Sequence, residues 1–306
     1  MKLIGLYATF PISPSNRIYM YIRYPIPNQT CIFINWELSP LSYNVFMEEF
    51  IVFPVLFGVM AWYMTNLLAD ILPYAPEKGP LCEYADCRAA IPVRDYLLLR
   101  RCPICGRQRR ARTWILLVVM LAASLYLWLL PPKGIGYPGG IIVFTYLTTV
   151  AYIDLEHHLI LRPLSLAGVI LGGITGFMMQ GWKSMLLGAV AGFIILFFFY
   201  LFGKLFDRIR ARRLGTDAVG DEALGSGDVT LAIILGLMVG WPFIWFNILL
   251  GILCAGAVSI VIILWLVFTK HYGQKAFAFF IPLGPGFILA TMLILYFPSY
   301  LAVIVP

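Results

Sequence analysis

The chain has 306 residues, of which 61% are hydrophobic and 12% are charged, whereas a typical soluble domain is about 45–50% apolar and about 25% charged. A water-soluble globule of this length cannot bury so many apolar side chains, so the composition excludes a soluble enzyme, a nucleic-acid-binding domain and a disordered chain. The formal net charge of +7 is typical of a membrane protein whose Lys and Arg gather in the loops on one side.

The N-terminal segment 1–46 precedes the first apolar stretch and is rich in Pro and Tyr. It lacks both the long apolar run of a membrane span and the compact apolar core of a signal peptide. Met47 stands directly before Glu48, Glu49 and the first span. Two hypotheses follow: the segment is a short exported tail, or translation starts near Met47 and the segment is a start-site artefact.

Eight segments are apolar enough to cross a bilayer, which takes about 20 residues of helix. Trp241-Pro242 separates the sixth from the seventh. We therefore predict an all-α polytopic membrane protein with about eight spans, at about 50–72, 113–131, 138–154, 163–181, 184–206, 223–240, 243–269 and 279–300.

The basic residues lie mainly in alternate loops. Segments 73–112, 207–222 and 270–278 are rich in Lys and Arg, whereas the loops between them hold only Lys133 and Lys183. Since basic loops stay on the cytoplasmic side, these three segments are predicted to be cytoplasmic and both termini to lie outside. The predicted domains are an extension (1–46), a first transmembrane helix (47–72), a cytoplasmic loop domain (73–112) and a membrane domain (113–306).

The cytoplasmic loop domain holds four cysteines, Cys82 and Cys87 followed by Cys102 and Cys105. Two close pairs can bring four thiolates around one Zn²⁺, and four thiolates leave no open position for catalysis. Gly106 after the last cysteine suits a zinc-knuckle turn, and cytoplasmic thiols stay reduced. We predict a structural zinc site, with redox-active thiols or cysteines without a ligand as alternatives.

Two aspartates stand at the cytoplasmic ends of predicted spans: Asp154 ends the third and Asp228 begins the sixth. Charged side chains inside spans are costly and usually functional. Two carboxylates at one membrane depth suit an aspartyl protease, in which one activates water and the other, protonated, polarises the scissile carbonyl. The alternative is that each acid is simply solvated in the headgroup region, as Asp70 at the end of the first span also could be.

Gly225 and Gly227 precede Asp228 in a Gly-x-Gly-Asp segment. Glycines let a backbone come close to a substrate and leave an edge with which an extended peptide can pair. These two glycines are therefore predicted to bind the substrate.

The neighbours of Asp154 offer further alternatives. Glu156 could replace it as the catalytic acid, but it lies two residues further on, on another face of the helix, so we favour Asp154. His157 and His158 are predicted to be interface residues, with metal ligation as the alternative.

These motifs together resemble the type IV prepilin peptidase family (prepilin leader peptidase/N-methyltransferase) over about residues 48–300. The segments around Asp154 and Asp228 look like the two catalytic motifs of the family, and the cysteine segment looks like its zinc-binding loop. Further similarities lie at the end of the first span and the start of the last, in Asn66 with Pro73 and in Ile281-Pro282-Leu283-Gly284-Pro285.

The resemblance implies a Gly-x-Gly-Asp-type intramembrane aspartyl endopeptidase with Asp154 and Asp228 as its catalytic pair. It implies cleavage of the basic leader peptide from prepilin or pseudopilin precursors at the cytoplasmic face of the cell membrane. It also implies N-methylation of the new N-terminus with S-adenosylmethionine, for which the sequence offers no motif of its own. The expected partners are these precursors and membrane lipid, and no nucleic acid.

The chain departs from the family pattern at three positions. Thr230 stands where the family usually has Lys, Leu161 where it usually has Pro, and Ile71 where it usually has Arg. These departures motivate the alternative of a catalytically degenerate membrane scaffold for pilin-like proteins. A transporter that uses the two aspartates as ion sites is a third hypothesis, against which stands the lack of an inverted repeat.

Overall fold

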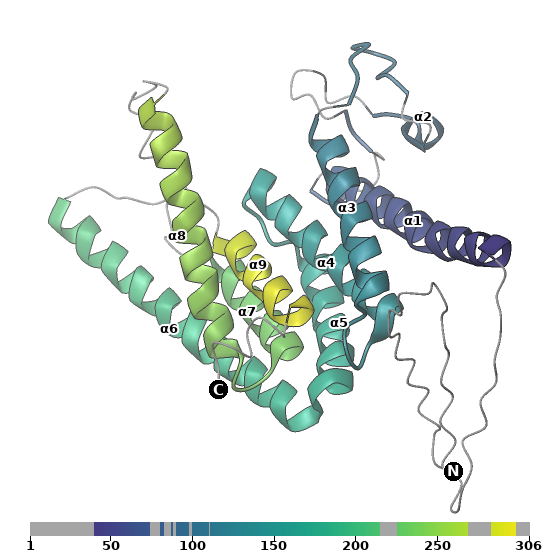
Figure 1. Cartoon of the computed structure of the whole chain (residues 1–306). Coiled ribbons are helices and arrows are strands. Elements are labelled where there is room, and N and C mark those ends of the chain that lie inside the picture. The colour runs from purple at the N-terminus through teal and green to yellow at the C-terminus, as the bar shows by residue number, and fades with distance from the viewer. Residues whose placement is uncertain are drawn as a thin grey trace, which may run out of the picture. The chain divides into compact units, whose positions relative to one another are not determined.

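The computed structural model describes residues 40–73, 80–82, 87, 90–97, 100–109, 111–214, 225–268 and 283–297. It divides into two compact units, residues 1–53 and 54–306, and the first contributes only the beginning of α1 to the described residues. The predicted extension 1–46 therefore lies largely outside them. Figure 1 shows the helices, which are α1 (Pro40–Ile71), α2 (Val93–Leu97), α3 (Ala111–Leu129), α4 (Gly136–His157), α5 (Arg162–Gln180), α6 (Trp182–Leu214), α7 (Ser226–Val239), α8 (Ile244–Phe268) and α9 (Leu283–Tyr296).

The all-α fold class is confirmed for the part of the chain that the structure describes, where the one β feature is an isolated bridge between Leu81 and Ala90. Within the described ranges, five helices are long and apolar enough to cross a membrane. They match the first five predicted spans and lie at Ile51–Ile71, Ala111–Leu129, Gly136–His157, Arg162–Gln180 and Trp182–Leu205.

The last three predicted spans correspond to α7, α8 and α9, whose apolar stretches are Gly227–Val239, Ile244–Ile260 and Leu283–Tyr296, although α8 itself continues to Phe268. The predicted span 223–240 is too long because Gly225 has extended backbone at one end of α7 and Gly240, at φ 71°, ends the helix at the other. The 14 residues of α7 extend about 21 Å, less than the hydrocarbon thickness of about 30 Å. Of the eight predicted spans, five are thus confirmed as helices of spanning length.

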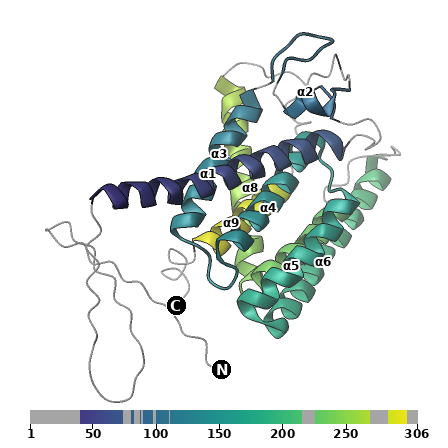
Figure 2. The same cartoon turned by 90° about the vertical axis from the view of Figure 1, so that its right-hand side faces the viewer.

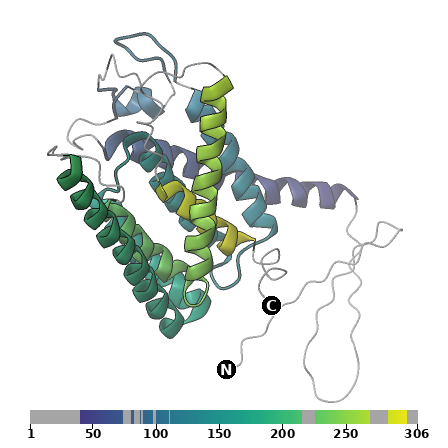
Figure 3. The same ribbon diagram turned by 90° about the vertical axis from the view of Figure 1, so that its left-hand side faces the viewer.

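Helix α7 lies at the centre of the second unit, where it packs against α5, α6, α8 and α9. Figure 2 shows α5 and α6 side by side, and Figure 3 shows α9 behind the longer α8, against which it packs. The side chains of Leu231, Ile234 and Met238 are fully buried in this packing. The helix that carries Asp228 is therefore enclosed by its neighbours rather than exposed to lipid.

Glycines on α5 and α6 let these helices come close to the backbone of α7. A Cβ atom added at Gly176, Gly188 or Gly192 would lie less than 3.0 Å from a backbone carbonyl oxygen of α7. Small residues at such positions are a usual means of helix packing in membranes, because dispersion contacts replace the hydrophobic effect there. The position of α7 thus depends on the absence of these side chains.

Gly176→Ala is predicted to destabilise the protein by about 1–3 kcal/mol, the usual cost of overpacking. The added methyl group would meet the Leu237 carbonyl oxygen of α7, and a backbone group cannot move aside as a side chain can. Thermal unfolding in detergent measures the effect. Gly173→Ala is the matched control on the same helix, since its Cβ would meet open space. Equal unfolding temperatures for the two variants would contradict this packing.

Candidate functional site

Asp154 lies in the last turn and a half of α4 and is buried, with 5% of its surface exposed. Its backbone carbonyl accepts a hydrogen bond from His158 N–H at 2.9 Å, which closes the helix. Its side-chain Oδ2 has no hydrogen-bond partner among the described residues. An unpartnered buried carboxylate oxygen is costly, so this arrangement indicates a site that takes a ligand, substrate or water rather than a purely structural acid.

The side chain of Asp154 faces the beginning of α9. A Cβ atom added at Gly284 would overlap Oδ2 of Asp154, and it would lie 3.5 Å from Leu231 on α7. Gly284 thus contacts both the α4 and α7 sides of the site. In the sequence, Gly284 is marked only by a family similarity, because a glycine in an apolar segment carries no chemical signal of a site.

Asp228 lies in the first turn of α7 and is partly exposed. Its Oδ2 accepts a hydrogen bond from Gly225 N–H at 3.3 Å, and its own N–H donates to Gly225 O at 3.1 Å. A carboxylate in the first turn is favoured by the helix dipole and by free amides. Asp228 therefore caps α7, and this capping interaction fixes the Asp228 carboxylate at the N-terminus of the helix.

Asp154, near the end of α4, and Asp228, at the start of α7, lie near one another. Their carboxylates lie near enough for their charges to interact. A Cβ atom added at Gly227, just before Asp228, would lie 3.1 Å from Ile160, just beyond α4. The structure thus brings together the predicted pair, which is separated by more than 70 residues in the sequence.

The two glycines predicted to bind the substrate differ in their surroundings. Gly225 has extended backbone, at φ −77° and ψ 153°, and a Cβ added there would meet nothing nearer than 3.8 Å. Gly227 lies within the first turn of α7, against Ile160. Of the two, Gly225 has the backbone form that an extended peptide could pair with.

Glu156, the alternative to Asp154, points toward another part of the molecule. Its carboxylate forms an ion pair with Arg112 at the start of α3. His158 is exposed and has left-handed backbone at the end of α4, with φ 52°. The only group of His, Cys, Asp and Glu side chains arranged for a metal in the described ranges is formed by cysteines, so His157 and His158 are not part of one there.

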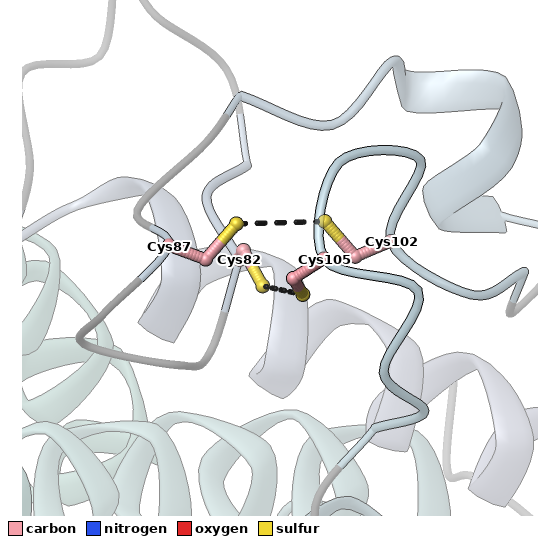
Figure 4. Close-up of side chains that lie close together, drawn as sticks. All are labelled: Cys82, Cys87, Cys102 and Cys105. Atoms are coloured by element: carbon pink, nitrogen blue, oxygen red, sulfur yellow. Dashed lines mark hydrogen bonds between the residues drawn. The ribbon is translucent and has the colours of Figure 1, made fainter.

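Figure 4 shows the four predicted metal-binding cysteines with their sulfur atoms turned toward one another. All four Sγ atoms lie within 4.8 Å of each other. Cys82 and Cys105 are 3.7 Å apart, and Cys87 and Cys102 are 3.8 Å apart. Four thiolates placed tetrahedrally at a Zn–S distance of about 2.3 Å are about 3.8 Å apart, whereas a disulfide needs about 2.05 Å. The cluster fits zinc and does not form disulfides.

The local backbone explains how the cysteines converge. Gly106 takes φ 68°, and its amide donates to Cys102 O at 2.9 Å to close the Cys102–Gly106 turn. Burial raises the pKa of the Cys102 thiol, but the backbone amides of Cys105 and Ile104, together with the thiols of Cys105 and Cys82, outweigh burial and bring the pKa to about 7. With this pKa, about half of the thiol is deprotonated at neutral pH, and the thiolate is the form that binds a metal.

Residues 141–261 match the family described as the Type IV leader peptidase family, a segment that includes Asp154 and Asp228. The prepilin leader peptidase/N-methyltransferase of Myxococcus xanthus is 29% identical over 193 residues, which cover 60% of this chain and 52% of that protein. The protein of the same name from Pectobacterium carotovorum subsp. carotovorum is 28% identical over 216 residues, covering 67% of this chain and 70% of that one.

The matched part of this chain thus spans about half the length of the Myxococcus relative. No solved structure is similar to the chain.

Purified protein is predicted to hold one zinc ion per chain, and Cys102→Ser to lose it, because the cluster needs four thiolates. Elemental analysis of the protein measures the zinc content. The matched control is Cys254→Ser on α8, outside the cluster. Zinc retention should fall as the pH is lowered from about 7 to about 5, since protons compete for the thiolates. Full retention by Cys102→Ser would contradict the assignment.

Proposed function

Because the chain belongs to the type IV leader peptidase family, we propose that it is an intramembrane aspartyl endopeptidase that cleaves the leader peptide from prepilin-like precursors. The family match and the names of the two relatives support a prepilin peptidase. The multi-pass arrangement of apolar helices supports a membrane enzyme.

The observation that carries this proposal is the buried, unpartnered Oδ2 of Asp154 beside Asp228. The amide of Gly225 donates to Asp228, and such a bond stabilises an ionised carboxylate. We therefore assign Asp228 as the general base that takes a proton from water. Asp154 would carry the proton that polarises the scissile carbonyl and would then pass it to the leaving amine.

Substrate binding would use the open backbone at the start of α7. Gly225 has the extended conformation and the free space that a peptide strand needs beside Asp228. The close approach of Gly284 to Asp154 leaves room for backbone but not for a side chain at that wall of the site. A precursor unwound near its cleavage point would fit such a site better than a regular helix.

We propose that all eight apolar helices cross the cell membrane and that the basic segments put the aspartate pair at the cytoplasmic face. The four cysteines would hold a structural zinc ion. The names of the relatives support N-methylation of the cleaved N-terminus with S-adenosylmethionine as a second activity; no residues are assigned to it.

Asp154→Asn and Asp228→Asn are each predicted to lower the rate of precursor cleavage by about 10²–10⁴, the usual contribution of a general acid or base. A prepilin-like precursor in liposomes is the substrate, and mass spectrometry of the products is the measurement. Asp95→Asn is the matched control, since Asp95 lies on α2 in a pair with Arg100. Cleavage at the normal rate by both variants would refute the aspartyl mechanism.

If the wild-type protein binds the precursor but leaves it intact, the proposed peptidase function is wrong, and the function becomes that of a catalytically degenerate scaffold. Thr230, two residues beyond Asp228, then becomes the first position to restore to Lys.

Gly284→Ala is predicted to lower cleavage at least about tenfold, because a displacement near 1 Å at a catalytic group can cost about 100-fold. The added methyl group would overlap Oδ2 of Asp154. Gly256→Ala on α8 is the control, since its Cβ would meet open space. An unchanged rate for Gly284→Ala would show that α9 does not border the active site.

A further inference from the structure

A cluster of charged and aromatic side chains lies between the end of α4 and the cysteine loop, by which we mean the described residues from 80 to 109. Its centre is Asp70 in the last turns of α1, which is 7% exposed. Asp70 accepts a hydrogen bond from Tyr96 OH at 2.7 Å and one from Arg112 at 3.3 Å, and it lies 3.9 Å from Arg109. A buried carboxylate needs such partners to offset its lost hydration.

The cysteine loop supplies two of these partners. Tyr96 lies on α2, between the two cysteine pairs in the chain, and is only 2% exposed. The guanidinium of Arg109 lies 3.8 Å above the Tyr96 ring and donates to Tyr96 O at 3.3 Å. Arg109 follows the Cys102–Gly106 turn by three residues, and Cys102 N–H donates to Arg107 O. The fold of the cysteine loop therefore determines where Tyr96 and Arg109 meet Asp70.

Arg112 connects this centre to α4. One of its terminal nitrogens binds Asp70 and the other binds Glu156. Its guanidinium also lies 5.6 Å from the ring centre of Tyr152, within the range of a cation–π interaction. Tyr152 and Glu156 are four residues apart, so they share a face of α4. Asp154 lies between them in sequence and faces the opposite way, toward α9.

Helix stability does not explain the pair of Arg112 and Glu156. Arg112 is in the first turn of α3 and Glu156 in the last turn of α4, so each charge stands at the end of its helix that the macrodipole disfavours. Each charge is instead compensated by the other. The pair thus joins the last turn of α4 to the start of α3, where Arg112 also binds Asp70.

We propose that Arg112 is a positioning residue that makes the placement of Asp154 depend on the metal-bound fold of the cysteine loop. The chain of contacts begins in the cysteine loop, where Tyr96 and Arg109 meet Asp70. It continues from Asp70 to Arg112 and ends at Glu156 on α4. This inference rests on the proposed peptidase function of Asp154. If Arg112 has this role, loss of zinc lowers the rate of precursor cleavage even though no metal ion takes part in the reaction.

The test compares wild type with Glu156→Gln, which removes the charge on α4 and leaves Asp70 with its partners. Hydrogen exchange of the His158 amide reports on the end of α4, because this amide donates to Asp154 O. In wild type, zinc removal by a chelator should speed this exchange. In Glu156→Gln the exchange should already be fast, and the chelator should add nothing. An equal response to the chelator in both proteins would overturn the proposal.

Cleavage kinetics supply the second readout. Glu156→Gln should keep its zinc and its KM while kcat falls about tenfold. In Arg112→Met, kcat should fall to a similar extent, and Arg112→Lys should recover part of that loss. The double variant with Arg112→Met and Glu156→Gln should have a kcat close to that of either single variant, because the effects of coupled residues are not additive. Asp95→Asn, which breaks the exposed pair with Arg100 in the same loop, should change none of these quantities.

Additive losses, or an unchanged kcat in Glu156→Gln, would overturn the coupling. The exchange experiment needs no substrate, so failure of the wild type to cleave a precursor would refute the peptidase function separately from the coupling.

Discussion

The carboxylate of Asp154 is the group on which the rest of the site depends. It is buried among apolar helices, and its Oδ2 has no partner among the described residues. Placing a carboxyl group there costs free energy, so the surrounding helices must hold it in place. On one side, Gly284 on α9 lies close against the Asp154 carboxylate. On the other side of α4, the ion pair of Glu156 with Arg112 holds the last turn of the helix.

The second aspartate is held by a different means. Asp228 caps the short helix α7 through Gly225, and α7 is held by glycines on α5 and α6 that leave no space for side chains. A backbone-to-backbone fit of this kind is stiff, because there are no flexible side chains at the contact to yield. The distance between the two acids therefore depends on helix packing rather than on hydrogen bonds between them.

The cysteine loop adds a third constraint from outside the bilayer segments. Its four sulfur atoms converge at spacings that suit a tetrahedral metal, and its Tyr96 and Arg109 contact Asp70 at the end of α1. A loop of this length has little apolar surface with which to fold by itself. A metal ion held by the four cysteines would compensate for this, together with the ion cluster around Asp70.

Much of this protein follows from sequence alone. Composition determined the all-α membrane class, and the long apolar runs located the five helices of spanning length, because hydrophobicity over about 20 residues is a local property. The spacing of Cys82, Cys87, Cys102 and Cys105 located the cysteine cluster that could hold a metal ion, and the rarity of acids in apolar segments singled out Asp154 and Asp228. Tertiary structure decided what depends on contacts between distant segments. It ended α7 at Gly225 and Gly240, placed Gly284 against Asp154, and turned Glu156 away toward Arg112. A glycine or a charged residue carries no mark of its partner in the sequence, since the packing of whole helices chooses that partner.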